Sequence, residues 1–417
     1  MTRQIVVCMD GTWNDPIEQT NVYRLFQMLT GEEQQVEENG PIRSHLVKSS
    51  EELIAFYLQS IGNGGRSQGL LGGTQGIGLH DSMIDAYLLI SQVYQRGDKI
   101  WLFGFSRGAW AARSLGAFIA RSGLIPAADA DDDSAADQAE KIWLNYKEDR
   151  GKKRGGRFWR HHDETPIRMI GVWDTVGELG VPVFNGLRLV DRDELRFLKF
   201  SDCELSPRVE HARQALAIDE ERADFVPTLW DEREGIKQVW FPGAHADVGG
   251  GYENRGLSDI ALEWMMQEVN KLDADLWLSP SLLSQALTPD CLQDRHDETR
   301  GPVWRTRPSK ERKIPESAEL HPSALQRCGS GPTIDPRRWK IFQHAPVSTR
   351  RMSRTPKKNC SRNGKPCPSG SCRLMARRAS RRMPTNGGMP PASRWTWAKG
   401  TASRPAAQGS TKRSQLA

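Results

Sequence analysis

The chain has 417 residues, with 58 Lys and Arg against 52 Asp and Glu and a formal net charge of +6. Residues 336–417 hold 20 of the basic residues and no acidic residue, so residues 1–335 carry a net charge of −14. The net charge of +6 therefore describes neither part of the chain. In addition, no apolar run approaches the roughly 18 residues of a membrane-spanning helix.

Short β-branched and aromatic runs alternate with longer amphipathic stretches, which is the pattern of a parallel α/β sheet. Strands are predicted at Gln4–Met9, Ile54–Leu58, Lys99–Phe103, Ile167–Trp173 and Lys237–Phe241. Helices are predicted at Asn21–Leu29, His80–Tyr94, Arg107–Arg121 and Asp259–Lys271. We therefore expect one α/β domain over residues 1–332, with a mostly parallel sheet and helices on both faces.

A polar insertion separates the third and fourth predicted strands. Residues 127–165 have an acidic first half and a basic second half. Charge runs of this kind are usually solvated, so we interpret the insertion as a solvated excursion. The alternative is a lid beside the active site.

Residues Gly104–Gly108 have the sequence Gly-Phe-Ser-Arg-Gly and lie between a predicted strand and a predicted helix. Gly-x-Ser-x-Gly in this setting is the nucleophile elbow, a tight turn that exposes the hydroxyl of Ser106. The backbone N–H of Arg107 would lie at the start of the helix and point at a developing oxyanion.

A serine nucleophile needs a base, and the base needs an orienting carboxylate. Asp174 and His245 each follow a predicted strand, in the chain order Ser, Asp, His of this fold. Asp247 and Asp10 are alternative acids. Asp247 lies only two residues from His245, so Asp174 is ranked first.

The loop after the first strand offers a second oxyanion donor. A backbone N–H from an early strand–helix loop often completes the oxyanion hole, and Gly11 or Thr12 could supply it. An ordinary turn capped by Asp10 is an equally good interpretation.

No cofactor or metal is expected. Residues Gly72–Gly78 imitate the spacing of a dinucleotide-binding loop, but no apolar strand precedes them. His211 lies in a stretch that we interpret as helical and structural, and His161 and His162 lie in the charged insertion. The Cys and His spacings fit no common zinc pattern well.

Together these motifs resemble the α/β-hydrolase domain of the type VI secretion lipase effectors, a family with uncharacterised bacterial and fungal members. The resemblance covers about residues 1–330 and is carried by the segments Met9–Asn14, Gly104–Ala109, Gly171–Gly177 and Gly243–Tyr252. It implies a Ser-His-Asp esterase, in the effectors a phospholipase, with Ser106, Asp174 and His245 in the matching positions. A lipid or other ester substrate is then expected, with secretion-machinery or immunity partners if the protein is an effector.

The basic segment 333–417 is almost free of Leu, Ile, Val and Phe after His344. Such a composition cannot bury enough apolar surface to fold, so the segment is either a disordered tail or the product of a frameshift. Lys and Arg there, with Trp395 and Trp397, make nucleic-acid binding an alternative function, although none is expected of the catalytic domain.

The N-terminal apolar run Ile5–Met9 is shorter than the h-region of a signal peptide, which is about 7–15 residues long. We therefore expect a protein that is cytoplasmic as synthesised, or exported by a signal-independent system. The predicted activity is carboxylic ester hydrolysis, either phospholipase-like or on a non-lipid ester.

Overall fold

The structure is a computed structural model, and it describes most of residues 3–329. The described ranges are 3–11, 14, 16–36, 42–59, 75–130, 134–149, 165–176, 205–272, 287–300, 305 and 308–329. All of them belong to the first of two compact units, which spans Met1–Arg351. Thr12, His161, His162 and the basic segment 333–417 lie outside the described residues.

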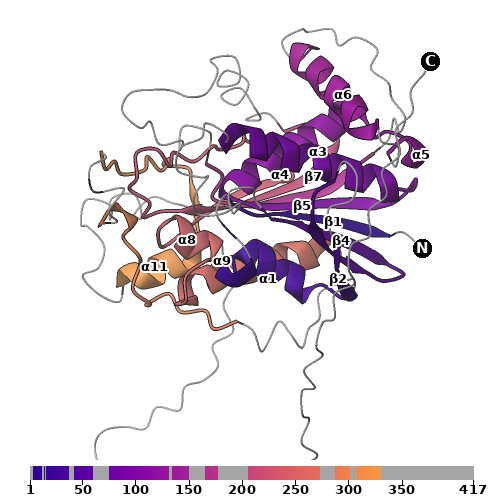
Figure 1. The fold of residues 1–417 in the computed structure, drawn as a ribbon. Coiled ribbons are helices and arrows are strands. Elements are labelled where there is room, and N and C mark those ends of the chain that lie inside the picture. The colour runs from indigo at the N-terminus through magenta and orange to yellow at the C-terminus, as the bar shows by residue number, and fades with distance from the viewer. Residues whose placement is uncertain are drawn as a thin grey trace, which may run out of the picture. The chain divides into compact units, whose positions relative to one another are not determined.

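The described residues form a nine-stranded sheet in the order β2-β3-β4-β1-β5-β6-β7-β8-β9 (Figure 1). The pairs β2–β3 and β3–β4 are antiparallel, and all other neighbours are parallel. The strands are β1 Gln4–Met9, β2 Glu32–Val36, β3 His45–Ser49, β4 Leu53–Leu58, β5 Lys99–Phe105, β6 Ile167–Trp173, β7 Val209–Ala217, β8 Ile236–Phe241 and β9 Glu319–Leu320.

The predicted mostly parallel α/β fold is confirmed, and all five predicted strands are present to within two residues at each end. The interpretation of the stretch around His211 as a helix is wrong, because Val209–Ala217 is strand β7, which lies between β6 and β8. The strand contains two polar residues, Arg213 and Gln214. Both side chains are buried in the structure, where the Arg213 guanidinium donates to the carboxylate of Glu268 at 2.7 Å.

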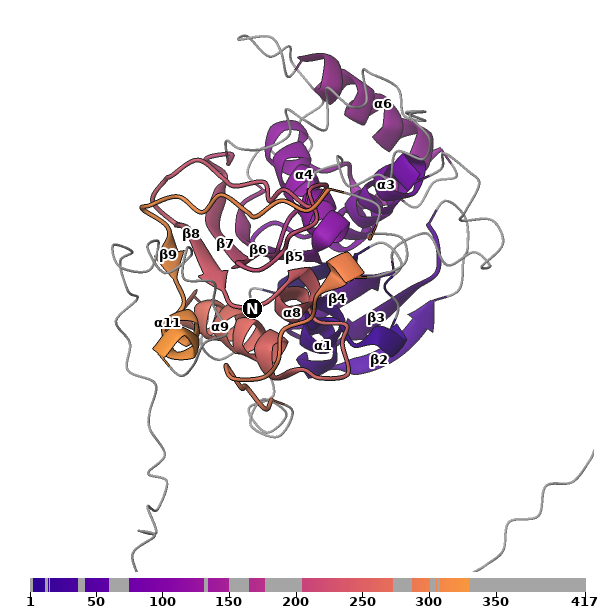
Figure 2. The same ribbon diagram turned by 90° about the vertical axis from the view of Figure 1, so that its left-hand side faces the viewer.

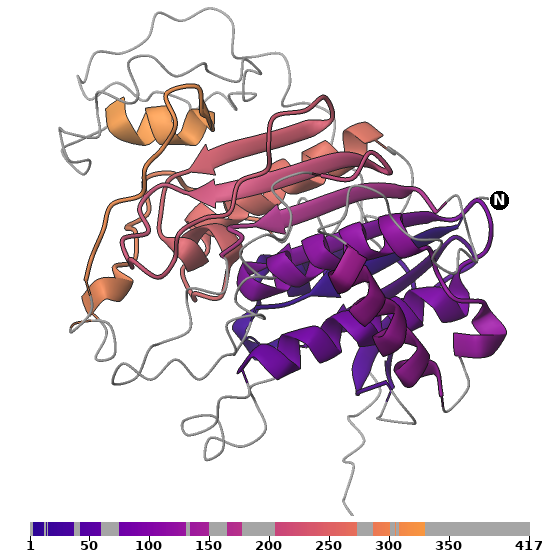
Figure 3. The same ribbon diagram turned by 90° about the horizontal axis from the view of Figure 1, so that it is seen from above.

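Helices cover both faces of the sheet (Figures 1 and 3). Helices α3, α4, α5 and α6 lie on one side, and α1, α8 and α9 lie on the other (Figure 1). Their bounds are α1 Asn21–Met28, α3 Gln75–Val93, α4 Ser106–Ser122, α5 Ala127–Ala130, α6 Ala135–Asp149, α8 His245–Gly249, α9 Gly256–Leu272 and α11 Pro322–Gly329, with the 3-10 turns η1 Pro16–Glu18 and η4 Glu298–Arg300.

Alternate residues of the central strands enter opposite cores. In β5, Ile100 and Leu102 pack with α3, α4 and α6, whereas Trp101 and Phe103 pack with α1 and α9. All four side chains are fully buried. Both faces of the sheet are therefore apolar, and polar side chains are left to the loops at the strand ends.

The first half of the charged insertion is part of the core. Helix α6 buries Ile142, Trp143 and Tyr146, and the Trp143 ring lies 5.2 Å from that of Phe118 on α4. The expectation of a solvated excursion is therefore wrong for α6, which is an amphipathic helix with Asp137 and Glu148 exposed and its aromatic residues buried. Residues 150–164, which hold most of its basic residues, lie outside the described residues.

The carboxyl ends of the strands, which Figure 2 shows facing the viewer, gather the polar loops of the protein. The connection that leaves β1 leads to β2 at one edge of the sheet, whereas the connection that leaves its neighbour β5 leads to β6 in the opposite direction, so the sheet has a reversal of connectivity between β1 and β5. Open α/β sheets bind ligands at the carboxyl ends beside such a reversal.

Among the described residues, no helix is long and apolar enough to cross a membrane.

A pair of neighbouring substitutions tests the packing of α6. Trp143→Ala removes a side chain that is 3% exposed, and we expect it to lower the free energy of unfolding by about 3–5 kcal/mol. Leu144→Ala alters a side chain that is 47% exposed and should change it by no more than about 0.5 kcal/mol. Denaturant unfolding of both variants measures the difference, and equal effects would contradict the buried position of Trp143.

Candidate active site

Ser106 lies at the junction of β5 and α4 with a backbone φ of +56°. A residue other than glycine in this left-handed region is strained, and such strain persists only where the surrounding structure fixes it. Ser106 is 8% exposed and lies at the carboxyl end of the central strand. This geometry is that of the nucleophile elbow which the sequence predicts.

Two glycines flank Ser106 because the chain passes very close to itself. A Cβ atom at Gly108 would lie 2.1 Å from the backbone oxygen of Met9, and one at Gly104 would lie 2.4 Å from that of Gly108. Backbone atoms cannot move aside as a flexible side chain can. Both positions therefore require glycine.

Asp174 and His245 meet directly. The Nδ1 atom of His245 lies 2.5 Å from Oδ2 of Asp174, although the two residues are 71 positions apart. Asp174 follows β6 with a φ of +44° and is fully buried, and His245 begins α8 and is 5% exposed. The ionised carboxylate accepts the Nδ1–H, which leaves Nε2 as the basic nitrogen of the imidazole.

Two aromatic rings pack against the imidazole of His245, and an acidic residue binds the backbone of His245. Its centroid lies 4.6 Å from that of Phe105, the residue before Ser106, and 4.9 Å from that of Phe225. Its backbone N–H donates to the carboxylate of Glu220 at 3.1 Å. Burial lowers the pKa of His245, outweighing the hydrogen bond with Asp174, which raises it.

Arg312 completes the surroundings of Asp174, and no sequence motif pointed to it. Its Nη1 and Nη2 atoms donate to Oδ1 and Oδ2 of Asp174 at 2.6 and 2.8 Å. Burial alone would raise the pKa of Asp174, but the charge of Arg312 and the hydrogen bond from His245 hold it well below its usual range. In the sequence Arg312 lies in the run Lys-Glu-Arg-Lys, which resembles an ordinary solvated surface.

The two alternative acids bind elsewhere. Asp247 accepts from Nδ1 of His296 at 2.7 Å and from the N–H of Ala244 at 2.9 Å. Asp10 accepts from the hydroxyl of Thr20 at 2.6 Å and from that of Tyr57, and burial raises its pKa to about 6. Asp174 is therefore the carboxylate that the structure places on His245.

The expected oxyanion donors are only partly in place. Arg107 is the second residue of α4, so its N–H is among those at the helix start that have no acceptor within the helix. The N–H of Gly11 instead donates to Oδ1 of Asp10 at 2.8 Å, which counts against Gly11 as a donor. Thr12 lies outside the described residues.

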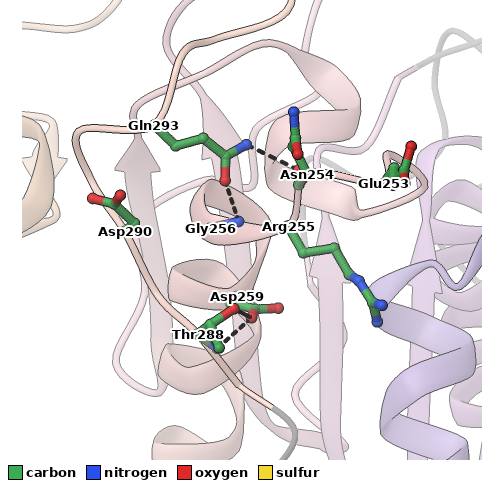
Figure 4. A pocket seen from close by; sticks show the side chains of 8 residues that line it. All are labelled: Glu253, Asn254, Arg255, Gly256, Asp259, Thr288, Asp290 and Gln293. Carbon is green, nitrogen blue, oxygen red and sulfur yellow. Dashed lines mark hydrogen bonds between the residues drawn. The ribbon is translucent and has the colours of Figure 1, made fainter.

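A separate surface hollow lies at the start of α9 (Figure 4). Glu253, Arg255, Asp290 and Gln293 are among its lining residues, and none of the candidate catalytic residues lines it. At this hollow the side-chain oxygen of Gln293 accepts a hydrogen bond from the N–H of Gly256 (Figure 4).

Within the described part of the chain, no group of three or more His, Cys, Asp or Glu side chains is arranged to hold a metal ion.

Comparison with known proteins identifies related chains. Residues 3–268 match the family described as "T6SS, Phospholipase effector Tle1-like, catalytic domain". An uncharacterised protein of Saccharomyces cerevisiae is 28% identical over 247 residues, which is 54% of this chain and 32% of the yeast protein. The chain thus spans about a third of the length of this curated relative.

Solved structures that match part of the chain include the following proteins. An uncharacterised protein from Pseudomonas aeruginosa is 16% identical, with a TM-score of 0.38, over 70% of this chain and 49% of that one. The Tle1 effector bound to the VgrG spike of the type VI secretion system is 19% identical, with a TM-score of 0.31, over 61% of this chain and 52% of that one. The esterase Est2 of Thermogutta terrifontis is 12% identical, with a TM-score of 0.31, over 67% of this chain and 84% of that one.

The glycine of the elbow can be tested by adding one methyl group. Gly108→Ala should lower the free energy of unfolding by at least about 2 kcal/mol, because its Cβ would overlap the backbone of Met9 and Asp10. The control is Gly116→Ala on the same helix, where the Cβ meets the movable tip of Ile170 and the cost should stay below about 1 kcal/mol. Thermal and denaturant unfolding measure both, and a Gly108→Ala protein as stable as the control would contradict the close approach.

Proposed function

Because the chain belongs to the Tle1-like family of type VI secretion phospholipase effector catalytic domains, whose members are hydrolases of the lipase and esterase class, we propose that it hydrolyses carboxylic esters through Ser106, His245 and Asp174. The observation that carries this proposal is the 2.5 Å contact between Asp174 and His245 beside the strained Ser106. These three residue types are the nucleophile, base and orienting acid of serine hydrolases.

The proposed reaction has two acyl-transfer steps. His245 accepts the proton of Ser106 through Nε2 while the serine oxygen attacks the ester carbonyl, and Asp174 stabilises the imidazolium that forms. The N–H of Arg107 donates to the tetrahedral oxyanion, with Thr12 as the proposed second donor. His245 then protonates the leaving alcohol, and a water molecule repeats the sequence on the acyl-enzyme.

The proposed substrate is a phospholipid, and the alternative is a non-lipid ester. The family assignment favours the phospholipid, since the family is one of phospholipase effectors. Delivery by secretion machinery is a further proposal, because the related Tle1 effector was solved on the VgrG spike. Nucleic-acid binding through the segment 333–417 stays a prediction of the sequence, as that segment lies outside the described residues.

Removal of the nucleophile tests the activity. Ser106→Ala should lower kcat by several orders of magnitude on both phospholipid vesicles and soluble short-chain esters, because no covalent intermediate can form. The wild type should also react covalently with a fluorophosphonate probe, and the variant should not. Full activity of Ser106→Ala would exclude the mechanism. If the wild type cleaves the soluble esters and not the phospholipid vesicles, the result favours the non-lipid alternative.

The pH dependence of the reaction follows from the state of His245. The base must be neutral to accept a proton, and burial lowers its pKa from the ordinary value of 6.5. Activity should therefore persist below pH 6.5 and fall only as His245 becomes protonated at lower pH, so the acid limb of kcat/KM should lie below 6.5. A pH profile with a soluble ester measures the limb, and a limb above pH 6.5 would contradict the buried, neutral base.

A further inference from the structure

The segment 287–329 lies after the end of the family match at residue 268, yet it reaches the candidate active site. Its described residues, 287–300, 305 and 308–329, are drawn in orange in Figure 2 and include β9 and α11. The N–H of Lys310 donates to the backbone oxygen of Glu221 at 2.7 Å, and Ser309 forms a β-bridge with Arg222. The backbone of the segment is thus attached to the loop after β7, next to Glu220, which binds the N–H of His245.

Arg312 on this segment is buried and held by both terminal nitrogens of its guanidinium. Its side chain is 3% exposed. Besides the two bonds to Asp174, its Nη1 donates to the backbone oxygen of Ala217 and its Nη2 to that of Phe225, each at 2.8 Å. Its Nε has no hydrogen-bond acceptor among the described residues, so all four bonds come from the two terminal nitrogens of the fork. A planar guanidinium that binds both carboxylate oxygens fixes the plane of the carboxylate as well as its position.

We propose that Arg312 is a positioning residue for the reaction, which holds the Asp174 carboxylate in the plane that His245 requires and balances its charge in the buried site. The proposal rests on the ester hydrolysis proposed above. Arg312 touches Asp174 and not the reacting atoms, so it acts through the carboxylate. It is also the contact by which a segment beyond the family match enters the chemistry.

The charges around His245 determine how the loss of Arg312 changes the base. Among the described residues they are Asp174 from the end of β6, Glu220 and Arg222 from the loop after β7, and Arg312, which binds Asp174. Without Arg312 the negative charge of Asp174 is no longer balanced, so it favours the imidazolium more strongly. The pKa of His245 then rises, and the acid limb of kcat/KM moves to higher pH.

The experiment compares the full-length wild type with Arg312→Met, Arg312→Lys and Arg300→Met. Arg300 lies on the same segment, is 85% exposed at its side chain and pairs only with Asp297 among the described residues, which makes it a matched control. We measure kcat and KM for a soluble ester as a function of pH, the NMR titration of the His245 ring, and thermal unfolding. The NMR titration does not depend on activity.

Arg312→Met should lower kcat by about 10- to 1,000-fold with little change in KM. The pH midpoint of the acid limb of kcat/KM and the midpoint of the NMR titration of His245 should both move to higher pH, by about half a unit or more. Arg312→Lys keeps the charge without the fork, so its titration point should stay near that of the wild type while kcat falls. Arg300→Met should match the wild type in every measurement.

A folded Arg312→Met protein with wild-type kcat and an unshifted His245 titration overturns the proposal, as does a uniform loss of activity with an unshifted titration. Should Arg312→Met fail to fold, Arg312→Lys decides, because a wild-type kcat in that variant shows that the fork is not needed. If the wild type neither cleaves esters nor reacts with a fluorophosphonate at Ser106, the proposed function fails, and the titration of His245 still tests the effect of Arg312.

Discussion

The candidate site depends on one fully buried carboxylate. Asp174 has no exposed surface, and removing an ionised carboxylate from water costs several kcal/mol unless it is paired and hydrogen-bonded. The protein supplies His245, both Nη atoms of Arg312 and the backbone N–H of Ala217, which donates to Oδ1 at 2.9 Å. These donors come from β7, α8 and the segment after residue 287. The position of one side chain therefore requires distant parts of the chain to be folded together.

The register of the parallel strands explains why these residues meet. Phe105 of β5 pairs with Trp173 of β6, so Ser106 and Asp174 leave the sheet side by side. His245 follows β8 as the first residue of α8, and α8 contacts the neighbouring strand β7. Gly249 permits this approach, because a Cβ there would lie 1.9 Å from the ring of Phe105. Strand pairing and one missing methyl group thus set the geometry around the base.

The local sequence predicts the turn at Ser106 and the strands that lead to Asp174 and His245. It does not predict the contacts that depend on residues distant in the chain. The elbow around Ser106 and the strand ends before Asp174 and His245 have short-range signals, namely glycines and apolar runs. Arg312 has none, since the pairing of a lone arginine with a carboxylate 138 positions earlier is decided by tertiary structure. Strand β7, which the sequence suggests is a helix, buries the polar residues Arg213 and Gln214, and their partners come together only in the folded protein.

The charges of the site are balanced in pairs, and this balance suits the proposed chemistry. Asp174 is paired with Arg312, and Glu220 is paired with Arg222 at 2.8 Å, so the surroundings of a neutral His245 carry no net charge from these four groups. In the transition state of acyl transfer, a positive imidazolium and a negative oxyanion form together. The new charges then stabilise each other within a buried, preorganised set of dipoles and ion pairs, which need little rearrangement. A bare Asp174 would favour the imidazolium in the resting enzyme as well, and the neutral base would then be available only at higher pH. Arg312 therefore favours a base that is uncharged until the reaction makes it charged.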